Sequence, residues 1–436
     1  MRPQSIAQGR DAYRAKNVIV MISDGCGYNH IAAAGLYKYG KTGEMPFEEF
    51  PVKSFVSTYP AGGSYDPSRI WSDFNYASEG TTDSAAAATA IATGHKTYDG
   101  AIGVLGSKEK PEPVQNAVER AEELGRSTGV ITTVTFSHAT PAGFVAHNPS
   151  RDNYEEIARE MLLKSKADVV MGSGNPYYDY DGKKREKPSF KFVGGEDTWN
   201  AVCAGTAGAD ADGDGIADPW KLIQSREEFT ALGSGPAPKR LLGVPCVAGT
   251  LQQGRGGNEK ADPYIVPRTQ TVPTLAEMTR AAVNVLDDNK RGFFLMIEGG
   301  SIDSAAHSNE SGRMIEEEID FADAVHAVID WVDANSSWDD TLLIVTADHE
   351  TGYLTGPGSG PSADGKPVWN PIVANGAGKL PGMEWHSGDH TNSLVPIFAR
   401  GRASAALERR ATWRDPVRGA YLDNTDIAKT VFEVMQ

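Results

Sequence analysis

The chain has 436 residues, of which 40% are hydrophobic and 23% charged, a balance that supports a large buried core and excludes a mainly disordered protein. Its formal net charge of -16 at pH 7 argues against binding of nucleic acid or of an anionic membrane surface. No apolar run approaches the roughly 20 residues that a membrane-spanning helix needs, so no membrane span is expected.

Short apolar runs rich in β-branched residues alternate with helical patterns along the chain. The runs cover residues 17–22, 128–134, 168–171, 293–297, 341–346 and 394–399. Helices are expected over residues 84–93, 113–124, 153–166, 275–286 and 314–334. This alternation predicts an α/β fold with a largely parallel central sheet and helices on both faces.

Two long segments interrupt the alternation. Residues 177–262 are rich in glycine and irregular, and residues 355–388 are rich in glycine and proline with little periodicity. Long loops inside one domain usually carry function or a subunit contact. The sequence therefore predicts a single domain over residues 1–436 with insertions at 177–262 and 355–388, the second of which would cap the functional site or reach a partner subunit.

Acidic residues follow three of the apolar runs directly. Asp24 follows the first run, Glu298 follows residues 293–297, and Asp348 with His349 follows residues 341–346. Ligands of open α/β sheets bind beyond the carboxyl ends of the strands. An isolated Asp at such a place is usually a turn residue, but three acidic groups at strand ends indicate one shared site.

Asp303 and His307 lie four residues apart, just after Glu298. On a helix this spacing places both side chains on one face, where they could bind one metal ion, although exposed helices often carry the same pair. His390, in a glycine-flanked loop, would supply a second imidazole. Two imidazoles with carboxylates favour zinc, whereas oxygen-rich surroundings favour magnesium.

Ser84 stands where a loop meets the alanine-rich helix expected over residues 84–93. Its hydroxyl would face the positive end of the helix dipole, where anions bind well. A plain N-cap serine is the alternative. No histidine neighbours Ser84 in the sequence, so a bound metal would have to lower the pKa of the hydroxyl before it could act as a nucleophile.

Together these segments resemble the bacterial alkaline phosphatases from about residue 17 to about residue 400. The motifs that carry the resemblance are Ile22-Ser23-Asp24-Gly25, Thr82-Asp83-Ser84-Ala85-Ala86, Ala139-Thr140-Pro141-Ala142, Ser150-Arg151, Glu298-Gly299-Gly300-Ser301-Ile302-Asp303, Thr346-Ala347-Asp348-His349 and Asp389-His390-Thr391. Each motif is weak alone, but their order and spacing are specific. The resemblance implies an alkaline-phosphatase-like fold and a metal-dependent phosphate monoester hydrolase.

The resemblance also implies three metal sites. The ligands would be Asp303, His307 and His390 for a first zinc ion, Asp24, Asp348 and His349 for a second zinc ion that also binds Ser84, and Asp24, Thr140 and Glu298 for a third ion, normally magnesium. Ser84 would accept the phosphoryl group as a phosphoserine, and Arg151 would hold two oxygens of the phosphate.

Arg151 favours small phosphate monoesters as substrates. A monoester leaves two oxygens free for the planar guanidinium, whereas a diester replaces one of them with an uncharged arm. A phosphodiesterase of the same superfamily, or a catalytically inactive binding module stabilised by calcium, is the alternative.

Two positions depart from the family pattern. His138 stands where the best-known bacterial members carry an aspartate two residues before Thr140, and Ser304 stands where they carry a lysine. Because imidazole suits zinc and other transition metals, His138 brings the identity of the third ion into question. His386, four residues before His390, is a candidate partner of the ligands or a substrate contact.

A second candidate metal site lies in the first insertion. The residues of this D-x-D-x-D-G-x-x-D pattern, which is typical of calcium loops, are Asp210, Asp212, Asp214, Ile216 and Asp218. The bidentate Glu of an EF-hand is missing, because Lys221 stands at the twelfth position. A plain acidic turn is the alternative to a structural calcium site.

The remaining expectations concern cysteines and location. Cys203 and Cys246 are the plausible disulfide pair, and two unpaired thiols are the alternative. Residues 1–16 are polar, so an export signal is either absent or already removed. The resemblance and the calcium-like loop imply a periplasmic or secreted protein, and family members are commonly homodimers.

Overall fold

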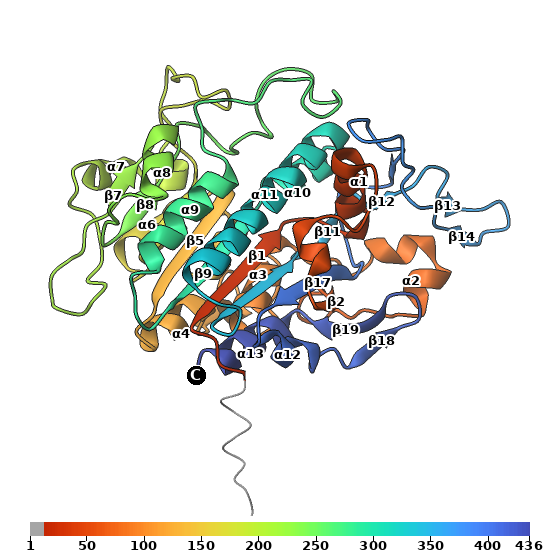
Figure 1. Ribbon diagram of the computed structural model, residues 1–436, viewed down its shortest axis with the longest axis horizontal. Helices are drawn as coiled ribbons and strands as arrows, with labels where there is room; N and C mark the ends of the chain where they lie inside the picture. Colours follow the sequence, from red (N-terminus) through yellow and green to blue (C-terminus); the bar gives the residue numbers. More distant parts are fainter. Residues whose placement is uncertain (1–12) are drawn as a thin grey trace, which may run out of the picture.

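A large mixed sheet runs through the computed structural model, which describes residues 13–436 (Figure 1). In order across the sheet, its strands are β18 (Trp413–Asp415), β19 (Gly419–Asp423), β2 (Val52–Ser57), β17 (Val395–Arg400), β10 (Thr341–Thr346), β1 (Asn17–Ser23), β9 (Phe293–Gly299), β5 (Ser127–Thr135), β6 (Val169–Ser173), β8 (Leu241–Gly243) and β7 (Lys221–Ile223). All neighbours from β10 to β7 pair in parallel, and β17 pairs antiparallel to both β10 and β2.

Helices cover both faces of this sheet. On one face, α1 (Tyr28–Tyr39), α9 (Leu275–Leu286), α10 (Ser301–His307) and α11 (Ser311–Asn335) form a connected layer (Figure 1). The opposite layer contains α3 (Ser84–Thr93), α4 (Ala117–Glu123), α5 (Ala139–Gly143), α12 (Ser404–Glu408) and α13 (Thr425–Val434). The predicted α/β fold with a largely parallel sheet is therefore confirmed.

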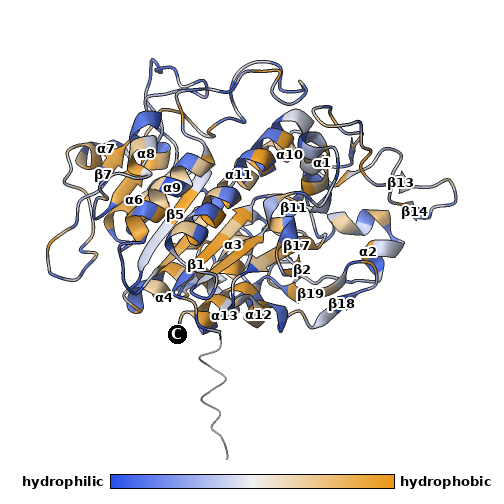
Figure 2. Ribbon diagram, viewed as in Figure 1, coloured by the Kyte–Doolittle hydropathy of each residue, from blue (hydrophilic) through white to orange (hydrophobic). Residues whose placement is uncertain are grey.

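Burial of the central strands on both faces explains their sequence. Every residue of β1, β9 and β10 is buried, and their side chains are mostly Val, Ile, Leu, Met and Phe. Figure 2 shows these strands as apolar, while the covering helices carry hydrophilic residues toward solvent. A strand with no solvent face needs no alternation of polar and apolar residues.

Capping side chains explain where several of the helices begin. Asn116 accepts a hydrogen bond from the Glu119 amide and caps α4, so this helix begins later than the predicted residues 113–124. Thr274 and Glu277 form a reciprocal capping box at the start of α9. Asp83 accepts from the Ala86 amide and caps α3, which places Ser84 in the first turn.

The remaining elements are short or peripheral. They are the helices α2 (Arg69–Ser72), α6 (Tyr154–Leu163), α7 (Glu196–Cys203) and α8 (Arg226–Leu232), the 3-10 turns η3 (Pro46–Glu49), η4 (Phe74–Ser78) and η5 (Lys191–Val193), and the strands β3 (Val104–Ser107), β4 (Lys110–Pro113), β11 (Glu350–Thr351), β12 (Leu354–Thr355), β13 (Gly360–Pro361), β14 (Pro367–Val368), β15 (Glu384–Trp385) and β16 (His390–Thr391). These last eight strands form four two-stranded ladders.

The two expected insertions differ in structure. Residues 177–262 are less irregular than the sequence suggests, because β7 and β8 complete one edge of the main sheet and α7 and α8 accompany them. Residues 355–388 hold only short ladders. Cys203 and Cys246 are both free thiols, so the disulfide is not formed in this structure. No helix within residues 13–436 is long and apolar enough to cross a membrane.

Candidate active site

The strand register brings the predicted acidic groups together at the carboxyl ends of neighbouring central strands. Ile22 of β1 pairs with both Glu298 of β9 and Thr346 of β10. Asp24 and Asp348 follow these strands within two residues, so their side chains reach the same level as Glu298. Parallel packing of three buried strands is therefore what gathers Asp24, Glu298 and Asp348, which are distant from one another in the chain.

Asp24, Asp348 and His349 form a fully buried group. His349 Nε2 lies 3.6 Å from Asp24 Oδ1 and 3.2 Å from Asp348 Oδ2, and all three side chains have no exposed surface. The Ser84 hydroxyl lies 3.2 Å from the same His349 Nε2. The candidate nucleophile therefore stands directly beside one candidate metal-binding group.

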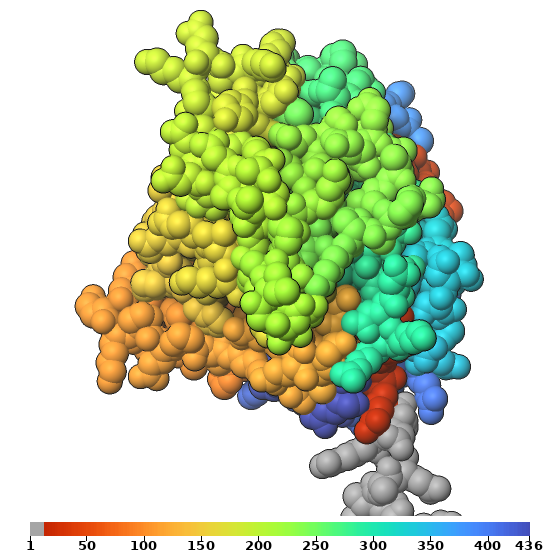
Figure 3. Space-filling model, turned by 90° about the vertical axis from the view of Figure 1, so that its left-hand side faces the viewer, coloured from red at the N-terminus to blue at the C-terminus, as the bar shows by residue number. Residues whose placement is uncertain are grey.

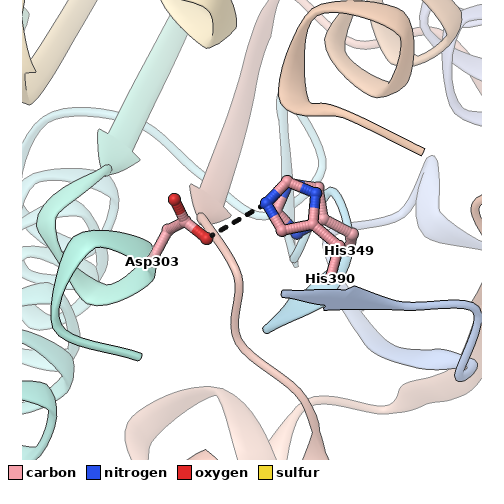
Figure 4. A group of neighbouring side chains, drawn as sticks. All are labelled: Asp303, His349 and His390. Carbon is pink, nitrogen blue, oxygen red and sulfur yellow. Dashed lines mark ion pairs between the residues drawn. The ribbon is translucent and has the colours of Figure 1, made fainter. Parts of the chain in front are cut away.

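Asp303, His307 and His390 form a neighbouring group. His307 Nε2 lies 3.3 Å from Asp303 Oδ2, His390 Nε2 lies 3.6 Å from Asp303 Oδ1, and the two Nε2 atoms are 3.0 Å apart. Figure 4 shows Asp303 pointing from α10 toward the imidazoles of His349 and His390, whose ring centroids are 3.6 Å apart. The two groups therefore share one pocket of converging ligands.

Asp24, His138 and Glu298 offer a third set of ligand atoms that lie close together. Thr140 Oγ1 donates to Asp24 Oδ2 at 3.3 Å, which places the predicted threonine at the same group. His138 Nε2 lies 3.4 Å from a terminal nitrogen of Arg151. The third set is thus connected to the residue expected to hold phosphate.

Arg151 is positioned at the start of α3 by an ion pair that the sequence analysis missed. Its Nη1 lies 2.9 Å from Asp83 Oδ2, and each side chain is 22% exposed. Because Asp83 also caps α3 and precedes Ser84, the guanidinium is held beside the candidate nucleophile. The aspartate that directly precedes Ser84, a residue type that often caps helices, is the signal from which the sequence could have predicted this position for Asp83.

Two threonines complete the contacts to the carboxylates, and the sequence analysis missed both. Thr351 Oγ1 donates to Asp303 Oδ1 at 2.6 Å and lies 3.3 Å from His349 Nδ1. Thr132 Oγ1 donates a short hydrogen bond to Glu298. Threonine is common in strands, so nothing local in the sequence distinguishes these two positions.

The buried acids resist ionisation without a cation. Burial, with the nearby Asp348 carboxylate, raises the pKa of Asp24, and burial with Asp303 raises the pKa of Asp348 to about 8. Burial also raises the pKa of Glu298 to about 7 and lowers that of His349. Each shift reflects the cost of placing charge in a dry site.

Unsatisfied atoms show that this site fits metal ions. Among residues 13–436, Asp24 Oδ1, Asp348 Oδ2, Glu298 Oε1 and His138 Nδ1 form no hydrogen bond. Buried polar atoms are normally paired. Carboxylates and imidazoles together are ligands that divalent cations bind well. The donor set therefore fits the ions that the family resemblance implies.

His386 lies apart from these groups. Its Nε2 is 2.7 Å from Thr355 Oγ1, and its ring packs edge-on against Phe74. It also lies near the Tyr353 ring. The structure thus places His386 in an aromatic cluster, where it contacts none of the candidate ligands.

The acidic loop gathers only part of its predicted set. Carboxylate oxygens of Asp210, Asp212 and Asp218 lie close together, while Asp214 accepts from the Ile216 amide. The ammonium of Lys239 lies 2.6 Å from Asp212 and 2.5 Å from Asp218. A protein cation therefore already contacts two of the three grouped acids.

Comparisons with known proteins identify the family of this chain. The family described as alkaline phosphatase matches residues 15–383. Alkaline phosphatase 4 of Bacillus subtilis (strain 168) is 30% identical to the chain over an alignment that covers 99% of the chain and 91% of that protein. The alkaline phosphatase of Escherichia coli (strain K12) is also 30% identical, over 77% of the chain and 70% of that protein.

Solved structures show the same fold. The cold-active alkaline phosphatase from the psychrophile Shewanella sp. superposes with a TM-score of 0.67 at 26% identity, covering 96% of the chain and 100% of that protein. The alkaline phosphatase from the Antarctic bacterium TAB5 superposes with a TM-score of 0.64 at 24% identity, covering 97% and 98%. The second likeness concerns the fold alone.

Proposed function

The chain belongs to the alkaline phosphatase family and is a phosphate monoester hydrolase, and we propose that its reaction proceeds through a phosphoserine at Ser84. The observation that carries this proposal is the position of the Ser84 hydroxyl, which is buried in the first turn of α3 and lies 3.2 Å from His349 Nε2. A hydroxyl there faces both the helix dipole and a set of metal ligands.

The proposed metal content follows the three groups. Asp303, His307 and His390 would hold one zinc ion, Asp24, Asp348 and His349 a second, and Asp24, Thr140 and Glu298 a third ion. When bound, these cations would lower the pKa of the serine hydroxyl and neutralise charge on the phosphate and the leaving oxygen.

The chain's own residues would then carry the steps. Ser84 Oγ, after losing its proton to solvent, attacks phosphorus, the ester P–O bond breaks, and the alcohol leaves. Arg151, held by Asp83, binds two phosphate oxygens and keeps the group in line with Ser84 Oγ. The amides at the start of α3 stabilise the phosphoserine dianion until water attacks phosphorus and the Oγ–P bond breaks.

Activity measurements on two substrates test this proposal. With p-nitrophenyl phosphate, Ser84→Ala should lower kcat by about a thousandfold or more, because the nucleophile is lost. Bis-p-nitrophenyl phosphate should be a poor substrate, and a chelator should abolish turnover of the monoester. Mass spectrometry after an acid quench should find phosphate on Ser84 of the unaltered chain. Full activity of Ser84→Ala would refute the mechanism, and faster diester turnover would favour the phosphodiesterase alternative.

His138 bears on the identity of the third ion. His138 supplies imidazole where an oxygen ligand would favour magnesium, so we propose that zinc or another transition ion competes there. A His-to-Asp mutant of TAB5 alkaline phosphatase has been solved with Mg bound in its M3 site. Metal analysis of His138→Asp should accordingly find more magnesium and less zinc per chain than the unaltered protein contains.

Further proposals rest on the family resemblance and on the acidic loop. We propose that the enzyme acts in the periplasm or outside the cell, that it assembles as a homodimer, and that residues 13–436 form one domain with the 177–262 and 355–388 insertions. Calcium at the acidic loop is also a proposal, and it would require Lys239 to leave Asp212 and Asp218. Sedimentation and calcium analysis of the purified chain test the dimer and the calcium site.

A further inference from the structure

A cavity of about 310 Å³ lies apart from the reaction centre. Aromatic side chains form much of its wall, namely Tyr28, Tyr65, Trp71, Tyr353 and Trp369. Neither Ser84 nor Arg151 lines it, and none of the proposed metal ligands does. This volume lies at the small end of the range of ligand pockets in proteins.

The β11–β16 ladder contributes residues both to this cavity and to the group of metal ligands. Thr351 pairs with His390 in the ladder, and Glu350 pairs with Thr391. Because successive residues of a strand point to opposite faces, Thr351 and His390 share the face toward Asp303, and Glu350 lines the cavity from the other face. The cavity and the ligand group therefore meet opposite faces of the same ladder.

Hydrogen bonds hold the aromatic walls in place. Buried Asp415 accepts from the Tyr65 hydroxyl at 2.7 Å and from Trp71 Nε1 at 2.9 Å. The Trp369 indole donates to the Tyr353 hydroxyl at 3.3 Å, and that hydroxyl donates to the Phe74 carbonyl. With their polar ends fixed in this way, the rings are arranged before any ligand binds, which lowers the entropic cost of binding.

The cavity contains a cation without an acceptor. The Arg418 guanidinium lies 4.6 Å from the Tyr28 ring centroid and 5.7 Å from that of Trp71. Asp415 is close to Arg418, but it accepts from the backbone amide of that residue rather than from the guanidinium. Across residues 13–436, the guanidinium donates no hydrogen bond and forms no ion pair. Burial lowers the pKa of Arg418. An arginine guanidinium nevertheless keeps its proton at neutral pH in proteins.

Glu350, the acidic residue of the wall, does not compete for this cation. One of its oxygens accepts from Thr391 Oγ1, and the other accepts from the Leu354 amide at 3.0 Å. The cavity therefore offers ring faces and one guanidinium with free donors. Ring faces bind planar apolar groups, and free guanidinium donors bind a carboxylate.

We propose that this cavity is a binding site for a small aromatic carboxylate. The ring of the ligand would stack between the aromatic walls, and its carboxylate would accept from Arg418. The site does not depend on the phosphoserine mechanism, because it shares no residue with that machinery.

Calorimetric titration of the metal-loaded, full-length enzyme tests the proposal. The probe is indole-3-acetate, and the uncharged indole-3-acetamide is its matched control. Saturating inorganic phosphate fills the reaction centre in both titrations. We expect one saturable site per chain for the acetate and binding of the acetamide that is at least about tenfold weaker, as loss of a charge-assisted hydrogen bond implies.

Substitutions locate the site. Arg418→Gln and Tyr28→Ala should each weaken indole-3-acetate binding, the former by about tenfold or more. Tyr28 is 42% exposed, so its removal tests the wall without disturbing the core. Arg400→Gln is the matched control, because Arg400 also stacks on a ring, that of Trp338, outside the cavity.

Three results would overturn the proposal. Unchanged binding by both cavity variants would place the probe elsewhere, and abolition of binding by phosphate would place it at the reaction centre. A smaller sedimentation coefficient for Arg418→Gln or Tyr28→Ala would assign this face to a contact between copies of the chain.

Discussion

The chain gathers carboxylates in two places, and their surroundings are opposite. At the carboxyl ends of the central strands, Asp24, Glu298 and Asp348 have no exposed surface, and each keeps one oxygen without a hydrogen bond among the described residues. The acidic loop lies in the yellow-green part of the chain, which forms part of the surface facing the viewer in Figure 3. There, Asp210 accepts hydrogen bonds from the amides of Gly213 and Gly215.

The difference lies in what neutralises the charge. Lys239 contacts two acids of the loop, and Arg240 anchors the same segment by donating to the carbonyls of Ala209 and Asp218. No lysine or arginine makes an ion pair with Asp24, Asp348 or Glu298 within residues 13–436. Spacing of acidic residues alone therefore does not identify a metal site, whereas burial with unpaired oxygens does.

Metal removal should have the largest effect and should separate the two places. Prolonged chelation should abolish monoester hydrolysis and lower the Tm by several degrees, because an ion present at a thousand times its Kd stabilises the fold by about 4 kcal/mol. Zinc with magnesium should restore both properties, and calcium alone should restore neither. Thermal unfolding and activity after each addition measure this.

Asp24→Asn provides the internal control for that experiment. The variant should be inactive, yet its metal-free form should unfold at a higher temperature than the metal-free unaltered chain, because the amide is neutral and folding no longer has to keep a buried carboxyl protonated against its ordinary pKa. A lower Tm of the metal-free variant would show that the buried Asp24 carboxyl does not destabilise the empty site.

Helix α11 carries two neighbouring buried acids that allow the same comparison, because among the described residues Glu316 forms an ion pair with an arginine and Glu317 does not. Burial raises the pKa of Glu317 to about 8, above its ordinary 4.5, although Arg268 acts in the opposite direction. The stability that protonated Glu317 contributes is present below pH 4.5 and is lost as the pH rises toward 8. Glu317→Gln, which stays neutral, should therefore gain about 1–3 kcal/mol of unfolding free energy at pH 8.5.

Glu316 is the matched control on the same helix. It is buried and pairs with Arg255 at 2.5 Å. Removing one partner of a buried pair leaves an uncompensated charge, so Glu316→Gln should lose about 3 kcal/mol. Urea unfolding of the metal-loaded variants at pH 6 and 8.5 measures both effects, and equal signs for the two substitutions would contradict this account.

The sequence predicted which residues form the framework of the site, because the neighbours of each residue in the chain mark it. Asp24 and Asp348 lie within two residues of the ends of long buried strands, whose apolar runs are readable without the structure. Thr351 could not be found in this way, since its contact with Asp303 joins residues 48 apart through folding. The edge strands β7 and β8 have three residues each, too few for a periodic signal.

Thr351 offers a smaller test within the buried place. Thr351→Val keeps the shape of the side chain but removes the hydroxyl that donates to Asp303. Loss of a hydrogen bond to a ligand typically weakens metal binding by 10–100-fold, so we expect about a tenfold loss of zinc affinity. Competition with a chromophoric chelator measures it. Thr93→Val, which removes a buried hydroxyl bonded within α3, should leave zinc affinity unchanged.

Lys239→Met should have the smallest effect, and it tests the acidic loop itself. If the ammonium occupies the position that calcium would need, its removal should raise calcium affinity a few-fold, the scale expected for an exposed ion pair. Calcium titration followed by calorimetry measures the change, and Lys366→Met, which removes a comparable exposed contact with Asp364, is the control. Tight calcium binding by the unaltered chain would show that the loop displaces its own lysine at little cost, and the contrast between the two acidic places would then lie in exposure alone.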